Sequence, residues 1–285
     1  MSIGSRVRIA IETECSAVKA GNVHPSASFV DLNYRHFLSA AKAIGDQVDL
    51  CADESVGQIA LKSVSAMMNA VGTNTSLGTI LLMAPLVAAT NRLTGASHQN
   101  GDLQLALKAI LLGLTPEDAR DIYQAIRIAN PGGLGDSQSM DVRDDAPLDI
   151  LQAMRVASSW DDIALQYVSD FELVFSIARR VEAKRVSGEA TNECIRCIQM
   201  ELLAERVDSL IARKQGLDFA KQVQTRAAEV IEAGAFGGQD YERAWRRFDA
   251  ELRDSEHRGN PGTIADLIAA ASFAGDYGDS LLLPP

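Results

Sequence analysis

Residues 72–89 read GTNTSLGTILLMAPLVAA, a polar turn followed by the longest apolar run of the chain. A helix that crosses a bilayer needs about 20 apolar residues, so this run is too short, and Thr79 and Pro85 interrupt it. An apolar stretch of this length is typical of a helix in a protein core. It predicts a buried central helix that begins beside a polar turn.

Helical periodicity extends through most of the remaining sequence. Val7, Ile11, Cys15 and Val18, for example, fall on one stripe at helical spacing. The chain has 41 alanines against 8 prolines, which favours closely packed helices. Alternating strand patterns are not convincing, and no Pro/Gly/Ser-rich linker divides the chain. The sequence predicts an all-α fold of roughly ten helices in a single domain over residues 1–285.

Charge and composition exclude several classes of protein. The 285 residues carry a net charge of −11, and 47% of them are apolar, which is typical of a globular protein and not of a disordered or fibrous one. Lysine and arginine are scattered, so we expect no nucleic-acid partner. Arg6 and Arg8 are followed by Glu12 and Glu14 where the apolar part of a signal peptide would stand. We expect a cytoplasmic protein without a membrane span.

The polar turn before the central helix is a candidate phosphate site. A helix start offers unpaired backbone N–H groups and a partial positive charge, so Asn74 and Thr75 are candidate phosphate-binding residues. The alternative is that a hydroxyl simply caps the helix there.

A second turn, residues 259–263, precedes another apolar helix and predicts a similar site with Gly262 and Thr263. Asp266 then falls in the first turn of that helix. A phosphate would be repelled by this carboxylate unless Mg²⁺ lay between them, which makes Asp266 a candidate metal ligand. The alternative is that the acid only complements the helix dipole.

Two further polar segments contain candidate ligands. In residues 208–216, Asp208 could bind a metal or a hydroxyl and Arg213 a phosphate, although Arg213 would also suit a solvated helix end. In the turn after the first helix, Lys19, Asn22 and His24 could face a ligand together with Glu14. A lone histidine is more often structural, so direct chemistry at His24 is the less common reading.

The order and spacing of five segments resemble the triphosphoribosyl-dephospho-CoA synthase family. The segments are KAGNVH (19–24), GTNTSLG (72–78), PGGLG (131–135), residues 208–216 and NPGTIADL (260–267). The resemblance implies an all-α enzyme that joins ATP to 3′-dephospho-CoA and releases adenine. It extends from about residue 8 to residue 275. Family positions carry over to residues of each segment, namely Lys19, Gly21, Asn74, Thr75, Asp208, Arg213 and Asp266.

The chain departs from the family pattern at two places. Enzymes of known activity resemble Asn-Thr-His-Lys-Gly where this chain has Ser76 and Leu77 in the third and fourth positions. They resemble Gly-Ala-Arg-Gly-Glu where residues 132–136 read GGLGD. Three polar or cationic side chains that suit a triphosphate are therefore missing. The sequence is similar to a divergent branch from archaea and one-carbon-metabolising bacteria, whose acceptor could be a methanopterin- or methanofuran-type precursor.

The resemblance implies displacement at the anomeric carbon of ribose. A hydroxyl attacks, a nucleobase leaves, and the transition state resembles an oxocarbenium ion. We expect Mg²⁺ on Asp208 and Asp266, ATP phosphates on the helix starts, Arg213 and Lys19 as cations, and Asp31 or Glu14 as general base. Two alternatives stay open, namely an N-glycosidic hydrolase and a non-catalytic ligand-binding homologue. A homodimer is compatible with the alanine-rich helix faces.

Overall fold

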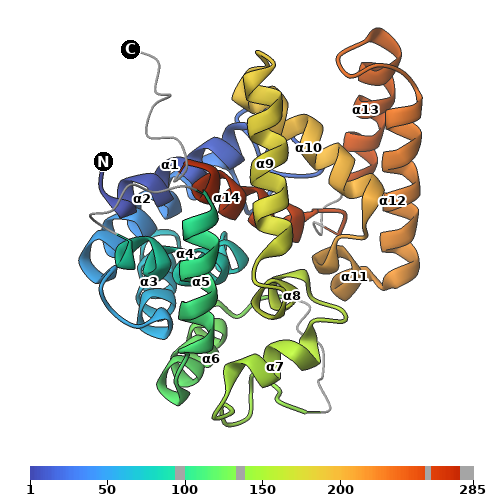
Figure 1. The fold of residues 1–285 in the computed structure, drawn as a ribbon. Coiled ribbons are helices and arrows are strands. Elements are labelled where there is room, and N and C mark those ends of the chain that lie inside the picture. The colour runs from blue at the N-terminus through green and yellow to red at the C-terminus, as the bar shows by residue number, and fades with distance from the viewer. Residues whose placement is uncertain (94–99, 133–138, 254–257, 277–285) are drawn as a thin grey trace.

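The computed structural model describes residues 1–93, 100–132, 139–253 and 258–276 of the chain (Figure 1). Within these ranges it contains fourteen α-helices and no strand, so the all-α class is confirmed. The helices are α1 (Ile3–Ser16), α2 (Tyr34–Cys51), α3 (Val56–Val71), α4 (Leu77–Arg92), α5 (Asn100–Leu112), α6 (Pro116–Ala129), α7 (Ile150–Ala157), α8 (Asp162–Val168), α9 (Glu172–Val186), α10 (Thr191–Glu205), α11 (Ser209–Gln215), α12 (Leu217–Glu232), α13 (Gln239–Leu252) and α14 (Gly262–Asp276).

The predicted number of roughly ten helices was too low, because short helices leave little periodicity in a sequence. Helices α7, α8 and α11 have only 8, 7 and 7 residues. Residues 191–215, for example, are divided between α10 and the short helix α11. The backbone of Arg206 is extended there, and Asp208 caps the new helix by accepting the N–H groups of Leu210 and Ile211.

The apolar run does form the central core helix. Helix α4 buries most of its length, including Leu82, Leu86 and Val87, and it contacts α1, α3, α5 and α14. Helix α14 is the second apolar helix of the core, and it packs against α1, α4, α9 and α10 (Figure 1). The chain therefore brings its C-terminal helix back beside α4.

Helix α1 is seated against α2 at a close backbone contact between two glycines. A Cβ atom on Gly45 would lie 2.7 Å from the carbonyl oxygen of Gly4, and one on Gly4 would lie 2.0 Å from that of Gly45. Asp49 of α2 also accepts the Gly4 N–H at 2.7 Å. These contacts fix the position of α1, whose other end carries Glu14.

We expect Gly45→Ala to destabilise the protein. The added methyl group meets backbone atoms of α1, so the two helices must separate, at a cost of roughly 1–3 kcal/mol. Thermal or urea unfolding measures this loss. Leu50→Ala, on the exposed side of the same helix, is the matched control and should change the stability by less than about 0.5 kcal/mol. Equal stabilities of the two variants would contradict the close packing of α1 on α2.

Candidate active site

A cavity of about 670 Å³ lies where the start of α4, the start of α14 and the end of α1 come together. Residues of α6, α7, α8 and α11 complete its wall. This volume is within the range of small-molecule binding sites, about 300–1,000 Å³. Several sequence-predicted residues line it, namely Glu14, Asn22, Asp31, Asn74, Thr75, Arg213, Gly262, Thr263 and Asp266.

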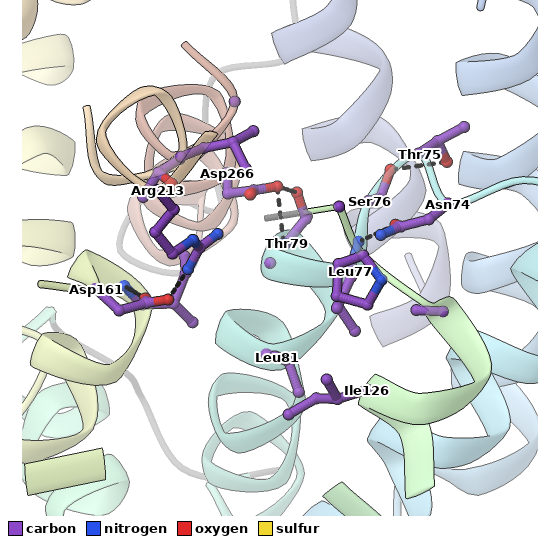
Figure 2. Close-up of a pocket in the computed structure, with 18 of the residues that line it drawn as sticks. Asn74, Thr75, Ser76, Leu77, Thr79, Leu81, Ile126, Asp161, Arg213 and Asp266 are labelled. Atoms are coloured by element: carbon purple, nitrogen blue, oxygen red, sulfur yellow. Dashed lines mark hydrogen bonds and ion pairs between the residues drawn. The ribbon is translucent and has the colours of Figure 1, made fainter. Parts of the chain in front are cut away.

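Asp266 of α14 reaches across the cavity floor to the first turn of α4 (Figure 2). Its Oδ1 accepts the backbone N–H of Thr79 at 2.9 Å and the Thr79 hydroxyl at 2.5 Å. The Ser76 side chain, at the N-cap position of α4, forms no capping hydrogen bond. Asn74 accepts the Leu77 N–H at 3.1 Å instead, and Asp266 accepts that of Thr79, so these two residues cap the helix. A Cβ atom on Gly78 would lie 2.2 Å from Asp266 Oδ2, so only glycine permits this approach.

The Asp266 carboxylate is held in an unfavourable environment for its charge. Burial raises its pKa to about 7, and the nearby Glu14 and Asp208 carboxylates add to the shift against the opposing bonds from Thr79. Helix α14 begins two residues earlier than expected, so Asp266 lies in the second turn and not the first. Its position is therefore not explained by the dipole of its own helix.

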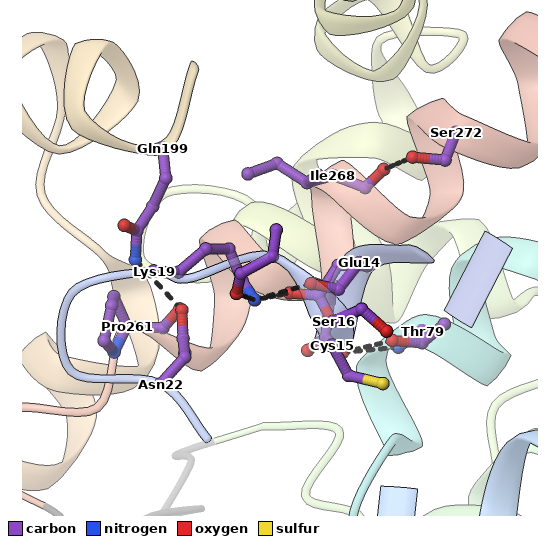
Figure 3. A network of polar contacts seen from close by, with 12 residues as sticks. Glu14, Cys15, Ser16, Lys19, Asn22, Thr79, Gln199, Pro261, Ile268 and Ser272 are labelled. Atoms are coloured by element: carbon purple, nitrogen blue, oxygen red, sulfur yellow. Dashed lines mark hydrogen bonds and ion pairs between the residues drawn. The ribbon is translucent and has the colours of Figure 1, made fainter. Parts of the chain in front are cut away.

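Glu14 is held by a buried ion pair with Lys19 (Figure 3). The Lys19 Nζ lies 3.0 Å from Glu14 Oε1 and also donates to the Glu14 carbonyl oxygen at 2.6 Å. Lys19 is completely buried and does not line the cavity, whereas Glu14 does. Burial raises the pKa of Glu14, and Lys19 lowers it again in part. Lys19, which was expected to bind phosphate, therefore fixes the position of the Glu14 carboxylate from outside the cavity.

Asp208 ties two helix starts together. Its Oδ1 accepts the N–H groups of Leu210 and Ile211 at the start of α11, and its Oδ2 accepts that of Ile264 in α14 at 2.8 Å. The residue is 1% exposed and does not line the cavity, and burial raises its pKa to about 6. Its oxygens serve as a clamp that positions α14, and through α14 also Asp266.

Arg213 of α11 is one of the cations that line the cavity. It forms an ion pair with Asp161, the N-cap of α8 (Figure 2). The guanidinium also lies close enough to Asp266 for their charges to interact. Arg213 is about one-fifth exposed and lines the cavity. A planar guanidinium at this place can donate to a phosphate or a carboxylate of a ligand.

The whole chain matches one protein family. The CitG family model, ATP:dephospho-CoA triphosphoribosyl transferase, matches residues 1–282. The chain belongs to this family. It is a transferase that moves the triphosphoribosyl group of ATP to dephospho-CoA. The resemblance inferred from the five polar segments is thereby confirmed.

A crystal structure from Archaeoglobus fulgidus has the same fold as the transferase. Its assignment as a triphosphoribosyl-dephospho-CoA synthase is provisional. The two chains are 20% identical, with a TM-score of 0.66, and the match covers 85% of this chain and 98% of that one. At this identity the likeness supports the fold alone. A comparison with curated proteins gives no match.

Three residues predicted for the site do not line the cavity of the transferase, namely Lys19, His24 and Asp208. His24 is 4% exposed, and its Nδ1 lies 3.1 Å from the Ser26 hydroxyl. Burial, with a smaller contribution from Arg253, lowers its pKa to about 4, so the imidazole is neutral at pH 7. The second family departure, at residues 132–136, lies mostly within 133–138, which are outside the described residues.

Sequence reasoning missed three cavity residues of the transferase, Thr79, Trp160 and Asp161. The ion pair of Asp161 with Arg213 spans 52 positions of the sequence. No local pattern could have indicated that contact. Thr79 was read only as an interruption of the apolar run, although a hydroxyl at the start of a buried helix is itself a signal of a polar contact.

The described part of the transferase has no group of three or more His, Cys, Asp or Glu side chains arranged for a metal ion. Among its described helices, none is long and apolar enough to span a membrane.

The raised pKa of Asp266 predicts a pH-dependent stability that the Asp266→Asn variant lacks. An unfolded aspartate titrates near 3.8, whereas the folded group titrates near 7. Between these values the folded state binds the extra proton, so the contribution of Asp266 to stability falls as the pH rises. Each pKa unit corresponds to about 1.4 kcal/mol.

Asparagine keeps an oxygen acceptor for Thr79 but carries no charge. We therefore expect the melting temperature of Asp266→Asn, relative to that of the wild type, to increase from about pH 4 to about pH 7 and then to level off. Calorimetry or circular dichroism in metal-free buffer measures both proteins. Parallel pH profiles would mean that Asp266 does not retain its proton in the fold.

Proposed function

We propose that the transfer takes place on the floor of this cavity, between the starts of α4 and α14. The observation that carries the proposal is the convergence of two carboxylates, the buried Glu14 and the half-buried Asp266, with Arg213 and an open helix start. Among the described residues no acceptor takes the Gly78 N–H, although its neighbours Leu77 and Thr79 are capped. A phosphate oxygen at Gly78 would complete the start of α4.

Asp266 fits a magnesium site that is shared with a substrate. Its Oδ1 is engaged by Thr79, but no described side chain or backbone group donates to its Oδ2. Protein-bound Mg²⁺ commonly has one or two carboxylate ligands, and water or phosphate oxygens supply the rest. A bound ion would neutralise phosphate charge beside Asp266. Asp208, the other predicted ligand, does not line the cavity, and both of its oxygens accept backbone N–H groups. Asp266 is therefore the proposed direct ligand.

Arg213 is the proposed phosphate-binding cation. Its partner Asp161 also accepts the N–H groups of Ile163 and Ala164, so the pair is anchored to the start of α8. This anchoring orients the guanidinium before a ligand arrives, which reduces the entropy that binding must offset. Lys214, the next residue, also lines the cavity.

Glu14 is the proposed general base. In the reaction, the acceptor hydroxyl oxygen forms a bond to C1 of the ribose while the bond from C1 to the adenine nitrogen breaks. The hydroxyl proton passes to Glu14, and adenine leaves with the bond electrons and takes up a proton. Burial raises the pKa of Glu14, which makes its carboxylate a stronger base than an exposed one, and the ion pair with Lys19 keeps the carboxylate in place. Asp31, the alternative base, is exposed at the cavity edge.

The decisive assay supplies ATP, Mg²⁺ and 3′-dephospho-CoA and follows adenine and adducts by mass spectrometry. Adenine together with the joined product is the expected result. Adenine with free ribose triphosphate would indicate a hydrolase. Binding without turnover would indicate either a non-catalytic homologue or a different acceptor, such as a methanopterin- or methanofuran-type precursor in one-carbon metabolism. Other acceptors should be tested because Ser76 and Leu77 stand where the enzymes of known activity have a histidine and a lysine. A cytoplasmic location and a homodimer stay predictions.

We expect Glu14→Gln to lower kcat by roughly 10²–10⁴-fold, the usual range for loss of a general base. Asp31→Asn is the matched carboxylate control and should stay within a few-fold of the wild type. Steady-state adenine release measures both. Because Glu14→Gln leaves Lys19 without its partner carboxylate, thermal unfolding must show that the variant is folded at the assay temperature. A larger effect in Asp31→Asn would transfer the role of base to Asp31.

We expect Mg²⁺ to strengthen ATP binding by about tenfold or more, or about 1.4 kcal/mol, relative to EDTA. Asp266→Asn should lose most of this difference and most of the activity, since an amide is a weaker ligand than a carboxylate for Mg²⁺. Isothermal titration calorimetry with and without Mg²⁺ measures it. Asp46→Asn removes an exposed carboxylate of α2 outside the cavity and should behave as the wild type. Equal ATP affinities in Mg²⁺ and EDTA would exclude the bridging ion.

A further inference from the structure

Trp160 stands out among the exposed apolar side chains. It lies in the turn between α7 and α8 and is 49% exposed. The described residues include other large apolar side chains that are exposed by more than a third, such as Val30, Leu105 and Leu148. Of this set, Trp160 alone lines the cavity. An indole ring left open to solvent on a cavity wall is a typical contact surface for a planar ligand.

The backbone beneath Trp160 is fixed. Its N–H donates to the Ala157 carbonyl oxygen at 3.0 Å, and the N–H of Asp161 donates to the same oxygen at 2.9 Å. Asp161 then caps α8 with its carboxylate. The ring therefore projects from a turn held at both ends, and a ligand that stacks on it would not have to order a loop first.

The wall beside Trp160 changes from polar to apolar. Ala153, Met154 and Ala157 of α7 line the cavity there, in contrast to the carboxylates and hydroxyls of the floor. A cation lies close by, because Asp161, the residue after Trp160, forms an ion pair with Arg213, and Lys214 also lines the cavity. A planar apolar surface next to cations matches a nucleotide, in which a flat base is joined to phosphates.

We propose that Trp160 is the stacking platform for the adenine ring of a substrate. The inference rests on the proposed function, in which both ATP and dephospho-CoA bring an adenine ring into this cavity. Either adenine could occupy the platform, and separate titrations with the two substrates distinguish them. Base stacking on an aromatic side chain contributes enough to change a dissociation constant by about tenfold or more.

Tryptophan fluorescence tests the platform directly, since the chain has only two tryptophans. Trp245 is an internal reference, because it is 6% exposed and does not line the cavity. The Cζ atom of Arg196 lies 4.4 Å from the centre of its ring. We expect ATP or dephospho-CoA, added singly to the full chain with Mg²⁺, to quench the wild-type emission. Inorganic triphosphate, which has no base, should not. In Trp160→Leu the remaining emission should not respond to either substrate.

Trp160→Leu should also raise the dissociation constant and KM of the substrate that stacks on the ring by about tenfold. The constants of the other substrate should not change. Trp160→Phe should recover most of the affinity, which a merely structural role would not require. Three results would overturn the platform: no quenching while calorimetry detects binding, unchanged constants in Trp160→Leu, or no binding of either substrate. If the wild type releases adenine and forms the joined product while Trp160→Leu has unchanged constants, the platform fails and the proposed function stands. If the wild type binds adenine nucleotides with quenching but forms no product, the proposed function fails instead.

Discussion

The contact between Asp266 and the start of α4 determines the geometry of the cavity. It joins the C-terminal helix to the central helix across 187 positions of the sequence. Because Ser76 does not cap α4, the helix start depends on this remote carboxylate and on Asn74. Gly78 must lack a side chain for Asp266 to approach. The same contact that seats α14 on α4 therefore also places a carboxylate oxygen at the open helix start.

This arrangement concentrates negative charge in a buried place. Glu14, Asp208 and Asp266 all have pKa values raised by burial, and the last two also repel each other. Lys19 compensates only Glu14, and Arg213 is partly neutralised by Asp161. Replacing buried charged groups by apolar residues often stabilises a protein, so a cluster of such groups on a cavity is characteristic of a functional site. A cation bound with the substrate would relieve the repulsion.

The sequence predicted those features that follow from local patterns. The apolar run forms α4, and the polar turn of residues 72–76 precedes it as expected. Asn74, Thr75 and Arg213 lie near helix ends and line the cavity. The roles of Lys19 and Asp208 could not be predicted in this way. Spacing alone does not show whether a side chain in a turn faces the cavity or the packed side, and these two are enclosed by segments distant in sequence.

The position of the cations has a consequence for phosphate binding in this chain. Resemblance to the enzymes of known activity implies a histidine and a lysine at the start of α4, where Ser76 and Leu77 stand, and the Leu77 side chain is almost buried in the cavity wall. The cations that line the cavity in the described residues come from α11 on the facing wall, and Arg213 is already paired with Asp161. A triphosphate at α4 would thus meet backbone N–H groups and a carboxylate before any free positive charge. If the proposed magnesium ion bridges the two, triphosphate binding to this chain should depend on the ion more strongly than in enzymes that carry the lysine.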